Sequence, residues 1–174
     1  MAGASGSGKT TLRRAIGEAL GMPTVELDSM YHGPGWTPIP TFVSDVERFA
    51  AGHEWVVEWQ YRRVRPMLAD RADLLVWLDH GRWTVLWRVT RRTVVRRLRR
   101  QELWNGNLEP PLWTIFTDPD HIIRWSWRTW RKAAVEVGEL KRPPVVRLRG
   151  QRQVNAWLTG PVAEAAWQRQ ANRT

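Results

Sequence analysis

The sequence of 174 residues contains no cysteine and no long apolar run. The absence of cysteine excludes disulfide bonds, thiolate metal ligands and a cysteine nucleophile. No apolar stretch approaches the roughly 18 residues that suggest a transmembrane helix, and the polar, glycine-rich start lacks the apolar core of a signal peptide. We therefore expect a cytoplasmic protein without a membrane partner.

Acidic residues are also scarce, since 17 Asp and Glu stand against 27 Lys and Arg, which gives a formal net charge of +10 at pH 7. Such an excess is typical of proteins that bind nucleic acids. It also suits a site that handles polyphosphates, or simply an arginine-rich proteome. The densest basic stretch is RRTVVRRLRR at 91–100, and its position relative to a functional site decides between these interpretations.

A phosphate-binding signature begins at the third residue, where the stretch GASGSGKT fits the pattern G-x-x-x-x-G-K-[ST]. In such a loop, glycines let backbone N–H groups converge on phosphates, and the following helix adds its positive end. The lysine reaches the β- and γ-phosphates, and the hydroxyl ligates Mg²⁺. The sequence therefore predicts ATP and Mg²⁺ as cofactors, with these nucleotide-binding residues: Gly3, Ser5, Gly6, Ser7, Gly8, Lys9, Thr10 and Thr11.

The rest of the chain alternates between helical and strand patterns. Helical spacing and end signals predict helices at 10–21, 41–52, 61–72, 81–100, 118–138 and 151–160. Apolar, β-branched runs predict strands at 24–28, 54–61, 73–79 and 143–150. The alternation predicts an α/β fold with a mostly parallel sheet. We expect one domain at 1–160 and a C-terminal tail at 161–174.

Five segments together resemble a known family, in the order GASGSGKTTL, VELD-x-M-Y-x-x-PGW, WVVEWQYRRVR, LLVWLD and RRLRRQELWNGN. They resemble the small adenylate-kinase-like P-loop kinases, most closely the group described as DNA topology modulation proteins, over about residues 1–159. The PGW and ELWNGN segments are much more specific to this group than the P-loop. The resemblance implies a three-layer α/β P-loop fold of the nucleotide-kinase type. It also implies a parallel sheet of order 2-3-1-4-5 and an arginine-rich lid around 88–120.

This resemblance draws attention to the short start of the chain. In the implied sheet the strand before the P-loop is central, yet only Met1 and Ala2 precede the loop. Its neighbours would then face unpaired backbone groups. We therefore expect that this chain lacks an N-terminal segment of about five or six residues, the usual strand length.

Two acidic residues are candidates for the chemistry. Asp28 ends the expected strand 24–28, at the sheet edge where α/β proteins bind ligands. It is a candidate base for a substrate hydroxyl or an outer ligand of Mg²⁺, and the alternative is a helix cap or turn residue. By the resemblance, Glu58 would join Thr10 at Mg²⁺ or contact the acceptor. The family pattern Asp-Gly-Asn-Tyr is here Glu58-Trp59-Gln60-Tyr61, so Trp59 stands where a glycine lets the backbone approach the acceptor.

Arginines supply the positive charge that phosphoryl transfer requires. On the expected helix 81–100, Arg88, Arg92 and Arg96 lie four residues apart on one face. We predict that these three are catalytic once the lid closes, together with Lys9 and Asp28. A surface role is the alternative for each arginine. The predicted acceptor-binding residues are Asp28, Trp36, Glu58, Tyr61, Arg62 and Arg65, and a solvated helix face is the alternative for the two arginines.

The 13 tryptophans are unusual, and aromatic residues beside arginines suggest stacking on the bases of single strands. The spacing of Trp77, Trp83 and Trp87 instead predicts core packing, in the last two on a stripe that continues to Val94 and Leu98. Trp36 and Trp104 are the candidates to face a ligand. The histidines show no metal-ligand spacing and are expected at loop or surface positions: His32, His53, His80 and His121.

The sequence therefore predicts a kinase that transfers the γ-phosphoryl of ATP to a nucleoside, a nucleotide or another small hydroxylated acceptor. One alternative is a nucleic-acid-associated P-loop protein, which the net charge favours. Another is an inactive kinase-like scaffold, which Trp59 and the short first strand favour. The acceptor itself is not predicted, because pocket contacts set it and the fold does not.

Overall fold

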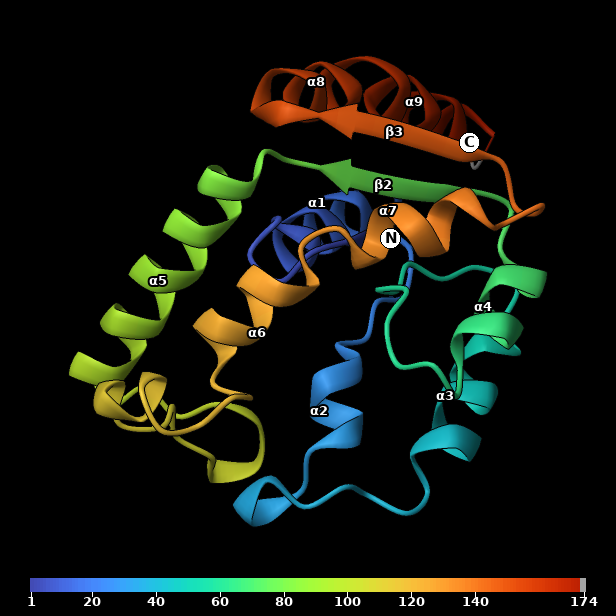
Figure 1. The fold of residues 1–174 in the computed structure, drawn as a ribbon. Coiled ribbons are helices and arrows are strands. Elements are labelled where there is room, and N and C mark those ends of the chain that lie inside the picture. The colour runs from blue at the N-terminus through green and yellow to red at the C-terminus, as the bar shows by residue number, and fades with distance from the viewer. Residues whose placement is uncertain (173–174) are drawn as a thin grey trace.

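A computed structural model describes residues 1–172 of the chain (Figure 1). Its strands are β1 (Ala2–Gly3), β2 (Leu75–Asp79) and β3 (Val145–Arg149). Its α-helices are α1 (Lys9–Leu20), α2 (Leu27–Tyr31), α3 (Phe42–Ala50), α4 (Arg65–Arg71), α5 (Arg82–Leu98), α6 (Ile122–Thr129), α7 (Lys132–Gly138), α8 (Gly150–Trp157) and α9 (Ala163–Ala171). Shorter turns are η1 (Pro34–Trp36), η2 (Trp104–Gly106), η3 (Leu112–Ile115) and the π-helical η4 (Leu158–Val162). In this described part, no helix is long and apolar enough to cross a membrane.

The three strands form one parallel sheet in the order β1-β2-β3. The expected α/β class with a parallel sheet is confirmed, and β2 and β3 lie within the strands predicted at 73–79 and 143–150. The free side of β1 is also paired. The Met1 amino group donates a hydrogen bond to the Val57 carbonyl at 2.7 Å, and the Met1 carbonyl accepts one from the Trp59 N–H at 2.7 Å.

The strands predicted at 24–28 and 54–61 are not formed, so the sheet has three strands instead of five. Thr24 and Val56 make only an isolated parallel bridge. The backbone then turns, because Tyr61 has a φ of 63°, in the left-handed region that does not continue a strand. Asp28 therefore does not end a strand. It lies in the first turn of α2, where a carboxylate is stabilised by the positive end of a helix.

Buried apolar side chains form two core clusters that share the sheet. In one cluster, Val76 of β2 packs with Leu12 of α1 and Val154 of α8. In the other, Leu27 of α2 and Phe42 of α3 pack with residues of α4 and α7. Figure 1 shows α8 and α9 beyond β3, at the opposite end of the view from α2 and α3. The P-loop and the start of α1 lie between these parts of the molecule.

Helix α5 is placed as expected, but the prediction of its packing face is wrong. Trp83 and Trp87 are 73% and 68% exposed, and the side chains that it buries include Val85 and Val89. The reason is a close approach between this helix and the P-loop. A Cβ atom on Gly6 would lie 2.4 Å from Val89 Cγ2, so this face has no room for an indole ring.

The C-terminal half differs from the expected helices in three places. The helix predicted at 118–138 is two helices, α6 and α7, and its cap is His121, whose Nδ1 accepts from the Ile123 N–H at 3.3 Å. His80 and His121 lie outside the helices and strands, as expected for loop positions, but their side chains are buried. Residues 163–171 of the expected tail form α9, where Arg169 pairs with Glu54 at 2.6 Å. Residues 173 and 174 of that tail lie outside the described residues.

Candidate active site

The loop between β1 and α1 has the geometry of a phosphate cradle. Gly6 and Gly8 have φ angles of 83° and 97°, which glycine adopts without strain. Gly8 caps the 12-residue helix α1. Within residues 1–172, the N–H groups of Gly8, Lys9 and Thr10 find no hydrogen-bond acceptor. Unpaired N–H groups at the positive end of a helix are the groups that bind a phosphate.

Lys9 is held against this loop. Its Nζ donates hydrogen bonds to the carbonyl oxygens of Gly3 and Ala4 at 3.0 and 3.1 Å. Burial lowers the pKa of the amine, while the nearby carboxylates of Glu58 and Asp28 act in the opposite direction. An anion bound at the loop would likewise favour the charged form of Lys9.

Ser7 supports the loop from inside. Its N–H donates to the Ala4 carbonyl at 3.1 Å, and its buried side chain lies against Gly3, where a Cβ atom would come within 2.5 Å of Ser7 Oγ. Thr11 is exposed on α1. Ser7 therefore shapes the cradle, and its N–H group is already used within the loop.

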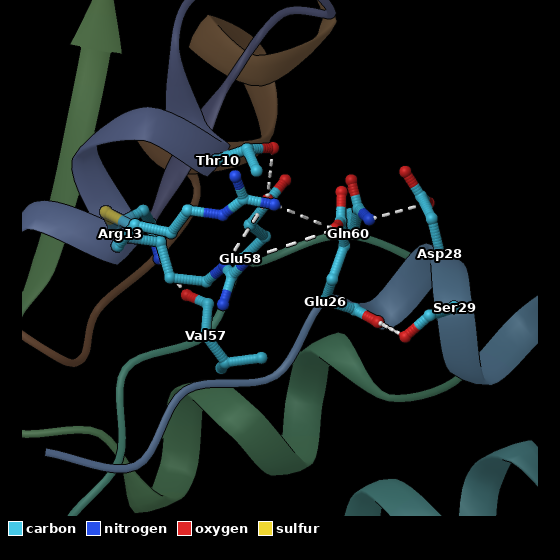
Figure 2. A network of polar contacts seen from close by, with 10 residues as sticks. Thr10, Arg13, Glu26, Asp28, Ser29, Val57, Glu58 and Gln60 are labelled. Carbon is cyan, nitrogen blue, oxygen red and sulfur yellow. Dashed lines mark hydrogen bonds and ion pairs between the residues drawn. The ribbon is translucent and has the colours of Figure 1, made fainter. Parts of the chain in front are cut away.

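Thr10 and Glu58 place two oxygen atoms beside the cradle (Figure 2). Thr10 Oγ1 donates to Glu58 Oε1 at 2.8 Å, and Arg13 Nε lies 3.7 Å from the same carboxylate oxygen. Magnesium usually takes one or two protein oxygens and completes its shell with phosphate and water oxygens. Among the described residues, no group of three or more His, Asp or Glu side chains is arranged to hold a metal ion. The pair of oxygens therefore fits Mg²⁺ that arrives together with a nucleotide.

A second polar group, which we call the acceptor subsite, consists of Asp28, His32, Gln60 and Tyr61. Asp28 Oδ1 accepts hydrogen bonds from Gln60 Nε2 at 2.9 Å, drawn in Figure 2, and from the Tyr61 hydroxyl at 2.5 Å. The Tyr61 hydroxyl also lies 3.3 Å from His32 Nε2. No donor to Asp28 Oδ2 is found in the described part of the chain. The carboxyl group is thus oriented through one of its two oxygens.

Burial sets the proton affinity of this subsite. Desolvation raises the pKa of Asp28, the Tyr61 hydrogen bond lowers it, and the nearby Glu58 carboxylate raises it. Desolvation also raises the pKa of Tyr61, so its hydroxyl keeps its proton and remains a donor. Desolvation lowers the pKa of His32. The subsite therefore combines a carboxyl group of raised pKa with hydrogen-bonding groups that are uncharged at neutral pH.

Sequence analysis gave no role to Gln60 and expected His32 at a loop or surface position. The available signal for His32 was its spacing of four residues from Asp28, which places both on one side of a helix. The prediction of a strand at 24–28 concealed this spacing. Gln60 meets Asp28 across 32 residues of sequence, a contact that no local pattern indicated.

Two of the three predicted arginines on α5 lie beside the P-loop. Arg92 Nη2 is 3.5 Å from Ser5 Oγ, and burial lowers the pKa of its guanidinium. Arg88 Nη1 would lie 3.9 Å from a Cβ atom on Gly8, and its other terminal nitrogen donates to Gln151 Oε1 at 2.9 Å. Both guanidinium groups therefore flank the cradle.

The remaining predicted arginines are held elsewhere. Arg96 pairs with Glu109 at 3.4 Å. Arg65 pairs with Glu136 of α7 at 2.5 Å and lies over the ring of Trp59 at 4.8 Å. Arg62 is exposed. The structure does not join these three guanidinium groups to the P-loop or to Asp28.

Trp36 and Trp104 lie where two irregular turns, η1 and η2, meet side by side at the lower edge of Figure 1. The Trp36 N–H donates to Asn107 Oδ1 at 2.9 Å, and Asn105 Nδ2 donates to the His32 carbonyl at 2.5 Å. The centroid of the His32 ring lies 5.1 Å from that of Trp36, in an edge-on arrangement, and 6.0 Å from that of Trp104, in a stacked arrangement. Both tryptophans thus border the acceptor subsite through His32.

Comparison with solved structures shows the fold. The chain matches a gluconokinase from Sinorhizobium meliloti 1021 with a TM-score of 0.50 and 22% identity, over 96% of this chain and 94% of that chain. The chain therefore shares the fold of this gluconokinase. A scan against protein-family models gives no match, and neither does a search of curated proteins. The finer resemblance to the DNA topology modulation group stays a prediction.

Proposed function

We propose that this chain is a kinase that transfers the γ-phosphoryl group of ATP to a hydroxyl group of a small acceptor. The observation that carries the proposal is the position of Asp28 relative to the cradle. Glu58 accepts a hydrogen bond from Thr10 at the start of α1, and Gln60, two residues further along the chain, donates one to Asp28 (Figure 2). The candidate metal ligand and the candidate base therefore lie next to each other beside the P-loop. The P-loop kinase fold supports the same conclusion.

The nucleotide half of the site uses the P-loop and α5. The unpaired N–H groups and Lys9 bind the phosphates, and the oxygens of Thr10 and Glu58 hold the metal ion. Mg²⁺ held by Thr10 and Glu58 would neutralise negative charge on the phosphates during transfer. Arg88 and Arg92 add positive charge from the side of α5, where phosphoryl transfer needs it most.

The acceptor half uses Asp28 as a base. Gln60 and Tyr61 fix one carboxylate oxygen, and the other accepts the proton of the acceptor hydroxyl. The hydroxyl oxygen forms a bond to the γ-phosphorus while the bond from that phosphorus to the bridging oxygen breaks, and the electron pair leaves with ADP. The products are ADP and a phosphomonoester, with the proton on Asp28. Its raised pKa makes this carboxylate a stronger base.

The position of Trp59 removes one reason for the scaffold interpretation. Its side chain is 8% exposed and belongs to the apolar core, and its Nε1 donates to the Arg65 carbonyl at 3.0 Å. The indole therefore lies in the core and does not fill the acceptor subsite. The nucleic-acid alternative is supported by the exposed Trp83 and Trp87 on α5 and is included as an arm of the test below.

ADP formation from Mg·ATP tests the proposal. The wild-type protein is assayed with nucleosides, nucleotides, sugars and single-stranded DNA, and Lys9→Ala gives the background. We expect at least one small hydroxylated acceptor to raise ADP formation well above that background. If nucleotide binds but no small acceptor does so, the kinase proposal fails, and stimulation by single-stranded DNA alone supports the nucleic-acid alternative.

Arg92 is expected to act mainly in the transition state. Arg92→Gln should lower kcat about 100-fold, the order found when one charged donor to a reacting group is removed, with a much smaller effect on Mg·ATP affinity. Arg99→Gln removes the same charge from an exposed position at the end of α5 and should leave kcat within about twofold of wild type, as expected for a surface change. Equal effects of the two variants on kcat would refute a specific role for Arg92.

A further inference from the structure

We propose that the acceptor is an uncharged molecule that presents a hydroxyl group to Asp28 and a flat or apolar face to the surrounding aromatic rings. This inference rests on the kinase function proposed above and specifies its substrate class. The sequence instead allowed a nucleotide acceptor, with Arg62 and Arg65 among the predicted acceptor-binding residues.

The polar atoms of the acceptor subsite carry negative or no charge. Asp28 is its only carboxylate, and the buried Glu58 lies close enough to act on it. Gln60 and Tyr61 are neutral donors that already bind Asp28 Oδ1. Because burial lowers the pKa of His32, its imidazole is neutral at pH 7. A carboxylate or phosphate placed here would face the carboxyl groups of Asp28 and Glu58.

The cations that could bind an anionic acceptor are paired with other groups, exposed, or located at the P-loop. Arg65 is paired with Glu136, and Arg13 lies between Glu58 and Glu26, 3.7 and 4.0 Å away. Arg62 is exposed. Lys9 and Arg92 lie at the P-loop, where the phosphates of ATP require them. Within the described chain, no guanidinium or ammonium group forms a hydrogen bond or ion pair with Asp28.

Aromatic rings provide the other part of the recognition. The ring centroids of Tyr31 and Tyr61 lie 4.4 Å apart. The centroid of the His32 ring lies 5.1 Å from that of Trp36 and 6.0 Å from that of Trp104. His32 Nδ1 is buried and has no hydrogen-bond partner among the described residues, so it offers a polar atom within this aromatic wall. Such a wall suits the apolar face of a sugar or the flat face of a base. A neutral sugar and a nucleoside share this chemistry.

Matched pairs of probes test the inference by binding. Affinities are measured by calorimetry on the full chain with Mg²⁺ and a non-hydrolysable ATP analogue, for glucose against gluconate and for adenosine against AMP. We expect one neutral member to bind at least about 100-fold more tightly than its anion, the order expected for juxtaposed like charges. Preference for glucose or for adenosine identifies a sugar or a nucleoside. Equal or tighter binding of the anions, or no binding by any probe, would overturn the inference.

This readout separates the inference from the proposed function. Neutral probes that bind without being phosphorylated would refute the kinase function and still support the neutral subsite.

A variant with an added charge tests the charge argument itself. Gln60→Lys adds a cation beside Asp28. It should reduce the ratio of neutral-probe to anion affinity at least tenfold, provided that its melting temperature shows a folded protein. Gln168→Lys adds the same charge at an exposed position of α9 and should leave the ratio unchanged. An unchanged ratio in a folded Gln60→Lys protein would count against the charge argument.

Discussion

Replacement of Lys9 by alanine should reduce phosphoryl transfer by about a thousandfold, the upper range for the loss of one preorganised charged donor. The Lys9 ammonium donates hydrogen bonds to the P-loop carbonyl oxygens of Gly3 and Ala4 at 3.0 and 3.1 Å. No other lysine of the described residues does so. The charge of Lys9 is needed where the γ-phosphate becomes more negative. Affinity for Mg·ATP should fall as well, by about 10- to 100-fold, the value of a charge-assisted hydrogen bond.

The fold should survive this change. The variant loses two hydrogen bonds to backbone carbonyls, but it also loses an ammonium group whose lowered pKa shows that burial disfavours its charge. Melting temperature should therefore change little. Lys141→Ala, at an exposed position after α7, is the matched control and should keep wild-type turnover and affinity. A Lys9→Ala protein with wild-type turnover would contradict the phosphate role of this residue.

Asp28→Asn is expected to have the second large effect, with opposite signs on activity and stability. Asparagine can still accept hydrogen bonds from Gln60 and Tyr61 at the oxygen that replaces Oδ1, but it cannot take the proton of the acceptor hydroxyl. Turnover should fall by about 10²- to 10⁴-fold, the usual contribution of a general base. Melting temperature at pH 7 should rise by roughly 2–4 °C, which corresponds to about 1 kcal/mol in a chain of this length.

The pH dependence of this stability gain follows from the raised pKa of Asp28. Between the ordinary pKa of an aspartate and the raised one, the folded protein binds more protons than the unfolded chain, so stability falls as pH rises through this window. This loss of stability is absent at a pH low enough to protonate Asp28 in both states, and it grows as pH rises through the window. The advantage of Asp28→Asn should therefore disappear in acid. An equal advantage at pH 3 and pH 7, measured by thermal denaturation, would contradict the burial argument.

The P-loop could be predicted from the sequence because its function depends on local backbone geometry. Gly6 and Gly8 adopt the left-handed angles that the motif requires, and the helix begins at Lys9, one residue before the predicted start. The α/β class, β2, β3 and α5 were also predicted correctly, since each depends on a run of similar residues. These features need no knowledge of distant contacts.

The acceptor subsite could not be predicted in the same way because it depends on contacts between distant segments. Asp28 meets Gln60 and Tyr61 from 32 and 33 residues away, and the turn at Tyr61 replaces an expected strand. The burial of α5 was also mispredicted. A tryptophan of α5 has a larger apolar surface than a valine and was therefore expected to be buried. The close approach of Gly6 to Val89 leaves room only for the smaller side chains on the buried face.

Phosphorus NMR of a reaction mixture tests the central claim most directly. The protein is incubated with Mg·ATP and the acceptor that gives the highest ADP formation in the panel. The account predicts that the γ-phosphate signal is replaced by a phosphomonoester signal and the β-phosphate signal of ADP in equal amounts, and that Lys9→Ala forms neither at a comparable rate. Formation of ADP with inorganic phosphate alone, at a rate that acceptors and the Lys9→Ala substitution do not change, would contradict phosphoryl transfer at this site.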